Sequence, residues 1–127
     1  MVGGRAFLIR NYMEARTVKI QGQEVHLLYC AATENGFEEL RGKSIHDLDF
    51  NLQQDLIVLG LCAIVSYYSR KGEDSPVTSE TLLYDATAQE LIELVKTVAE
   101  MRAEWYGVPA VIKQDDTAED GEDNRKN

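Results

Sequence analysis

The chain has 127 residues, 44% of them hydrophobic and 28% charged, which is typical of one small globular domain. Its 22 acidic residues outnumber its 13 basic ones, so the formal net charge is -9 at pH 7. Nucleic acids and anionic membranes bind clusters of Lys and Arg, and this charge therefore argues against both as partners. We expect the partners to be proteins, particularly proteins with basic or apolar surfaces.

The cysteines and the longest apolar runs indicate where the chain is found. Cys30 and Cys62 stand in apolar surroundings, and we expect two free thiols in a reducing cytoplasm, although their number alone permits a disulfide. The apolar run of residues 6–9 is shorter than the apolar core of a signal peptide. The run of residues 56–68 is shorter than the roughly 20 residues that span a bilayer. We therefore expect a cytoplasmic protein.

The N-terminal part of the chain predicts an extension followed by a β-hairpin. We expect residues 1–12 to be a flexible extension, and both Met1 and Met13 remain open as the natural start. Residues 17–20 and 24–29 are strand-like and flank Gln21-Gly22, a turn signal. Because an isolated hairpin is marginally stable in water, its apolar face should pack on the helices that follow.

The next segment predicts a short helix and a long central one. Thr33 is the expected N-cap of the short helix and Gly42 its expected end, although Asn35-Gly36 are poor helix formers. Residues 50–70 carry the strongest helical pattern, preceded by Ser44, which resembles the first residue of a capping box. This helix carries two apolar stripes, so we expect it to be buried on most sides or covered by another chain. The first stripe contains Leu52, Leu56, Leu59 and Ala63, and the second contains Ile57, Leu61, Ile64 and Tyr68.

Two further helices and a polar tail complete the prediction. A short helix is expected over residues 78–85, and an amphipathic one over residues 88–106, opened by a capping box of Thr87 and Glu90 and ended by Gly107. From residue 113 onward the chain has no large apolar residue, so an acidic, disordered tail is expected. The predicted fold class is α+β, mainly α, with an N-terminal β-hairpin packed on a small bundle of about four helices. Its expected divisions are an extension over 1–12, a single domain over 13–110 and a tail over 111–127.

The sequence contains no pattern of side chains that is typical of catalysis, of cofactor binding or of metal binding. Gly3-Gly4 lack the lysine and the helix of a phosphate-binding loop. The two histidines, His26 and His46, show no metal-ligand spacing. Cys62 lies in the most apolar helix, where a thiol stays protonated and inert. We therefore expect no enzymatic activity, no cofactor and no metal site.

The final helix carries the candidate partner-binding residues. Tryptophan and tyrosine combine a large apolar area with few rotatable bonds and dominate the hot spots of protein interfaces. Two aromatic pairs end the long helices: Trp105 with Tyr106 in the final helix and Tyr67 with Tyr68 in the central one. The alternative interpretation is that Trp105, with one tyrosine of each pair, closes the core, and both interpretations can hold at one helix end. The six candidate residues are Leu91, Val95, Val98, Arg102, Trp105 and Tyr106.

Several local motifs follow one another in a recognisable order. They are the strand pair with its glycine turn over residues 18–25, Phe37-Glu38-Glu39-Leu40 leading into Gly42-Lys43-Ser44-Ile45, the central apolar helix, the short helix marked by Pro and Thr, and the final helix ending in residues 104–109. In this order and these motifs, the chain resembles the tail assembly chaperones of long-tailed bacteriophages and related prophages. The resemblance covers roughly residues 17–109. The N-terminal extension has no counterpart in the family.

The resemblance implies a function and partners. Chaperones of this family hold the aggregation-prone tape measure protein in the bacterial cytoplasm until tail tube subunits polymerise around it. They act without ATP, tend to self-associate and are often also made in a longer, frameshifted form. The expected partners are therefore the tape measure protein, the tail tube protein and a second copy of the chain. The competing functions are a small structural tail or head–tail connector subunit and a host protein-binding adaptor.

Overall fold

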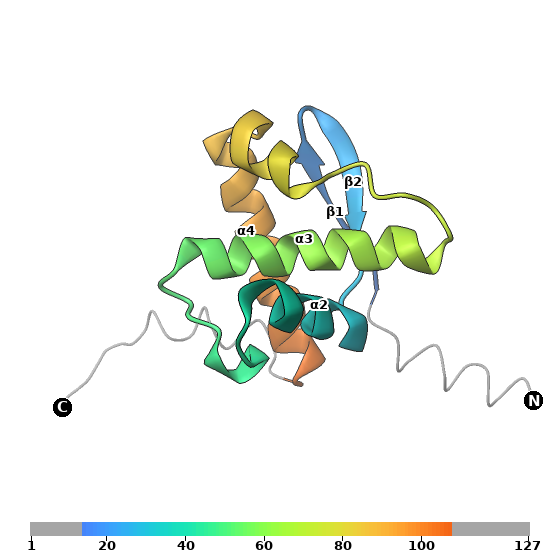
Figure 1. The fold of residues 1–127 in the computed structure, drawn as a ribbon. Coiled ribbons are helices and arrows are strands. Elements are labelled where there is room, and N and C mark those ends of the chain that lie inside the picture. Colours follow the sequence, from blue (N-terminus) through green and yellow to red (C-terminus); the bar gives the residue numbers. More distant parts are fainter. Residues whose placement is uncertain (1–13, 108–127) are drawn as a thin grey trace, which may run out of the picture.

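The computed structural model describes residues 14–107 (Figure 1). The expected N-terminal extension over residues 1–12 and the expected tail over residues 111–127 lie outside these residues. A hairpin packed against helices confirms the predicted α+β, mainly α, fold class. The elements are β1 (Arg16–Ile20), β2 (Gln23–Leu27), α2 (Ala31–Arg41), the 3₁₀ turn η1 (Ile45–Asp47), α3 (Gln53–Arg70), the π-helical turn η2 (Thr81–Asp85) and α4 (Ala88–Trp105).

The hairpin forms at the predicted turn. β1 and β2 are antiparallel, with Val18 opposite Val25. Gln21 and Gly22 both have positive φ, 55° and 77°, which is the backbone of the two-residue turn that matches the twist of the strands. β2 ends earlier than predicted, because the Leu28 amide donates to a carbonyl of α3 and so leaves the hairpin.

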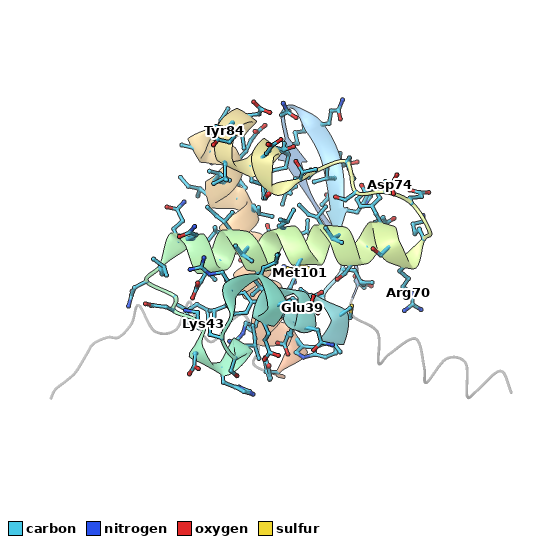
Figure 2. All side chains as sticks on the ribbon, viewed as in Figure 1. Glu39, Lys43, Arg70, Asp74, Tyr84 and Met101 are labelled. Carbon is cyan, nitrogen blue, oxygen red and sulfur yellow. The ribbon has the colours of Figure 1, made fainter. Side chains whose placement is uncertain are left out.

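α3 is the central helix, as its two apolar stripes predicted. It packs against α2, α4 and β2. In Figure 1, α4 passes behind α3, while α2 lies below it and the gold turn η2 above it. At Gly60 the crossing is close, because a Cβ atom there would lie 2.8 Å from the Leu94 Cγ. Met101 and Val98 of α4 are also fully buried, and Figure 2 shows Met101 behind α3.

Gly60→Ala tests this close crossing. Helix propensity alone predicts a gain of about 1 kcal/mol in stability for the alanine. We expect instead a loss of about 2 kcal/mol, because the added Cβ atom would force the fully buried Leu94 side chain to shift within the core. Urea unfolding measures the difference, with the exposed Ser69→Ala as the control in the same helix. A stabilised Gly60→Ala variant would show that the two helices separate easily.

α2 begins before the predicted N-cap. The helix starts at Ala31, and Thr33 is fully buried in its first turn, where its hydroxyl accepts from the Cys30 amide at 3.1 Å and donates to the Leu28 carbonyl at 3.0 Å. The prediction of Thr33 as the N-cap is therefore wrong. Gly36 lies where a Cβ atom would be 3.0 Å from the Cys62 Sγ, so a poor helix former stands where α2 approaches α3. Gly42 ends the helix with φ 69°, as predicted.

α3 begins at Gln53, later than the predicted residue 50. Between α2 and α3, residues 45–47 form the 3₁₀ turn η1, and Ser44 caps that turn by accepting from the His46 amide at 3.1 Å. Phe50 and Leu52, which the prediction placed inside the helix, are exposed. The capping signal at Ser44 was therefore real, but it belongs to η1 and not to α3.

Asp55 joins α2, the following loop and α3. Its carboxylate has no exposed surface. One oxygen accepts from the Arg41 Nε at 2.9 Å, and the other accepts from the Lys43 Nζ at 2.6 Å and from the Asp49 amide at 3.0 Å. Burial opposes ionisation, but the hydrogen bonds from Lys43, Asp49 and Arg41 outweigh it, so the pKa of Asp55 lies below its usual value. Both oxygens of this buried charge therefore hold neighbouring segments together.

Replacing Asp55 by Asn should lower stability at neutral pH by about 3 kcal/mol, because it removes the charge that two cations and an amide share. The folded-state pKa is lowered, so this stabilisation is present above the ordinary carboxyl pKa of about 3.9 and is lost as the pH falls below it. The difference between the wild type and Asp55→Asn should therefore shrink between about pH 5 and pH 3. Urea unfolding at both pH values measures it, with the exposed Asp47→Asn as control.

α4 begins with the predicted capping box. The Thr87 hydroxyl accepts from the Glu90 amide at 3.1 Å, and the Glu90 carboxylate accepts from the Thr87 amide at 3.1 Å. The same carboxylate accepts from the Gly22 amide at 3.0 Å. Amides of Gln21, Thr87 and Gly22 therefore lower the pKa of Glu90, and the hairpin turn is joined to the start of α4. At the other end of β1, Arg16 pairs with Glu100 and Glu104, so α4 holds the hairpin at both ends.

Candidate protein-binding groove

The first half of the predicted partner-binding set faces the core. Val98 has no exposed surface, so it cannot contact a partner in this structure, and its prediction as a contact residue is corrected. Leu91 and Val95 are partly buried and pack against the core. The apolar stripe of α4 is therefore used inside the domain, as expected for an amphipathic helix that packs on its own core.

The second half of the set is brought together at the C-terminal end of α4. Trp105 is 38% exposed and Tyr106 is 44% exposed. The Arg102 guanidinium carbon lies 4.9 Å from the ring centre of Tyr106 and 5.3 Å from that of Phe50, which sequence reasoning did not place in the site. The Arg102 Nε is buried and has no hydrogen-bond partner among residues 14–107. These side chains form a surface patch, and they line neither of the two clefts described below.

Trp105 also covers the core. One part of its surface therefore packs inside the domain, and the other part is exposed and available to a partner. Its ring centre lies 5.9 Å from that of Tyr29, which is fully buried. The hydroxyls of Tyr29 and Tyr106 both donate to the Glu34 carboxylate at 2.7 Å. Burial raises the pKa of both tyrosines, and the hydrogen bond to Glu34 raises it further. This end of α4 is consequently fixed to α2.

The other aromatic pair lies against the hairpin. The Tyr67 ring stacks on His26 of β2 with centres 4.7 Å apart. The Tyr68 hydroxyl accepts from the His26 amide at 3.3 Å. Tyr67 and Tyr68 therefore attach α3 to β2, which accounts for both rings without a partner protein.

Sequence reasoning missed a concave surface that follows one face of α3. Positions with the period of a helix line it from the first residue of α3 to the last. They are Gln53, Gln54, Ile57, Val58, Leu61, Cys62, Val65, Ser66, Ser69 and Arg70. This surface is called the α3 groove below. The sequence feature that could have indicated this surface is the second apolar stripe of α3, because two of its residues, Ile57 and Leu61, line the groove.

The α3 groove consists of two adjoining clefts. The first, of about 550 Å³, lies between α2 and α3 and includes Leu28, Cys30, Gly36 and Val65. The second, of about 480 Å³, lies between α3 and η2 and includes Ile57, Val58, Leu82 and Leu83. Leu40 and Leu61 line both clefts, so the two clefts adjoin.

Large apolar side chains are exposed along this groove. Leu40 is 62% exposed, Leu83 is 66% exposed and Val65 is 39% exposed. Few charges line it: Glu39 and Arg70 in the first cleft, and Arg41, which is bound to Asp55, in the second. Figure 2 shows Glu39 on α2 beside α3 and Arg70 at the end of α3. The groove therefore offers an apolar floor with charges at its edges, a composition suited to an apolar protein surface.

Two thiols line the first cleft, and both are free, as predicted. Cys62 is buried, and burial, with a smaller contribution from the charge of Glu39, raises its pKa to about 11. We expect an alkylating reagent at pH 8 to modify the partly exposed Cys30 in the folded protein and Cys62 only after unfolding. Mass spectrometry of timed samples measures both rates. Equal rates in the native protein would contradict the buried position of Cys62.

Comparisons of the chain with protein-family models, with curated proteins and with solved structures found no match. None of the helices within residues 14–107 has the length and apolar character needed to cross a membrane. In the same part of the chain, no group of three or more His, Cys, Asp and Glu side chains is placed to hold a metal ion. What the chain does is therefore inferred from its sequence and its own surface.

Proposed function

We propose that the chain is a tail assembly chaperone of a long-tailed bacteriophage or prophage. It works without catalysis in the bacterial cytoplasm and holds helical segments of the tape measure protein in the α3 groove. The order of motifs over roughly residues 17–109 supports the family. The observation that carries the binding mode is the pair of adjoining, mainly apolar clefts along α3, one beside α2 and one beside η2.

The dimensions and chemistry of the groove favour an amphipathic helix as its occupant. α3 has 18 residues. A helix of that length spans about 27 Å, which is long enough to contact several turns of a partner helix. Apolar side chains at i, i+3, i+4 and i+7 of such a helix would enter the two clefts, as in other complexes in which a groove binds a helix. Leu40, which lies between the clefts, is the natural central contact.

Charge predicts the polar residues of the partner. The net charge of -9 favours a segment whose apolar face is flanked by Lys or Arg. The same charge would make complexes with the chaperone repel one another, which keeps an aggregation-prone client in solution. This combination of an apolar groove and an acidic surface is what the proposed chaperone needs.

Charged substitutions in the groove test the proposal. Leu40→Asp and Val65→Asp place a carboxylate on exposed apolar positions, so the fold should be kept. We expect each to weaken binding of the tape measure protein at least ten-fold, or about 1.4 kcal/mol, because a charge would be buried unpaired in the complex. Ile92→Asp is the matched control, since Ile92 is 52% exposed on α4, outside the groove. Co-expression with the tape measure protein, followed by isothermal titration calorimetry, supplies the measurement.

Three results would contradict the proposal. The groove is the wrong surface if binding persists in Leu40→Asp but is lost in Trp105→Ala, because Trp105 lies in the patch at the end of α4. The chaperone function is wrong if the tape measure protein stays soluble without this chain. A chain that remains in purified virions would be a structural subunit instead.

A further inference from the structure

The N-terminal segment enters the domain at one end of the α3 groove. Arg16, the first residue of β1, is opposite Leu27 in the hairpin. Leu28, which follows Leu27 directly after β2, lines the first cleft, and its amide donates to the Ala63 carbonyl of α3 at 3.0 Å. β1 therefore begins opposite the residue that precedes Leu28, close to the first cleft.

The sequence of this segment has the chemistry that suits the groove. Residues 5–10, which lie outside the described part of the chain, read Arg-Ala-Phe-Leu-Ile-Arg. Phe7, Leu8 and Ile9 are large apolar side chains, and Arg5 and Arg10 are the only charged residues among the first thirteen. An apolar run between two cations matches an apolar groove in a chain whose net charge is -9.

The segment is also long enough. Residues 5–13 can span about 30 Å when extended, which exceeds the roughly 27 Å length of an 18-residue helix such as α3. A short tether gives such a segment an effective concentration in the millimolar range, so even weak binding would fill the groove.

We infer that residues 5–10 bind the α3 groove of their own chain and compete there with external partners. The segment covers Leu40 and the first cleft while no client is present, and a client with higher affinity displaces it. The inference concerns the same groove as the proposed function, but it does not depend on the identity of the client.

Alkylation of Cys30 in the full chain tests the inference, because this thiol lines the first cleft. Phe7→Asp combined with Leu8→Asp should release the segment and raise the alkylation rate of Cys30 about three-fold or more. Asn11→Asp is the matched control, since it adds a carboxylate to the same segment outside the apolar run. A peptide with the sequence of residues 1–13, added to the double variant, should slow the reaction again, and Leu40→Asp should abolish that protection.

Three outcomes would overturn the inference. One is an unchanged Cys30 rate in the double variant. Another is protection that disappears on dilution, because the segment would then occupy the groove of a second copy. The third is a native product that begins at Met13, which intact-mass measurement would show. If Leu40→Asp weakens client binding while the double variant leaves it unchanged, the inference fails and the proposed function stands.

Discussion

The arrangement of α2 and α3 depends on one buried carboxylate. Asp55 binds Arg41 at the end of α2, Lys43 and Asp49 in the following loop, and it belongs itself to the first turn of α3. Because Leu40 immediately precedes Arg41, this ionic network helps to position one of the two residues that both clefts of the groove share. A charge without exposed surface thus contributes to the shape of an apolar surface.

Features encoded by short-range signals could be predicted from the sequence. Gln21-Gly22 formed the expected turn, and Thr87 with Glu90 formed the expected capping box, because each depends on residues a few positions apart. The start of α2 could not be predicted in the same way. Thr33 looks like an N-cap locally, but its hydroxyl binds Leu28 and lies 2.9 Å from that of Ser66, so a contact with α3 decides its role. Tertiary contacts also decide where glycine is tolerated, as at Gly36.

The candidate site was harder to predict, since apolar periodicity does not distinguish a core face from a binding face. In α4 the regular stripe faces inward, and Val98 is fully buried. In α3 both predicted stripes contain buried residues, Leu59 in one and Ile64 in the other, while the exposed Val65 belongs to neither. Ile57 and Leu61 line the groove because α2 and η2 flank that side without covering it. The sequence predicted an excess of apolar surface on the central helix, and the structure shows which face it occupies.

The two sides of α3 differ in how firmly they are built. Behind it, α4 and the hairpin are joined at both ends by Glu90 and Arg16. On the groove side, η2 is anchored by the buried Leu82, while Leu83 and Tyr84 are exposed on a π-helical turn, a geometry often found at functional sites. A groove with one lightly attached side would adapt its width to what enters it more easily than a groove with two firm sides. Such a receptor would accept successive stretches of a long client that differ in sequence, trading selectivity for breadth.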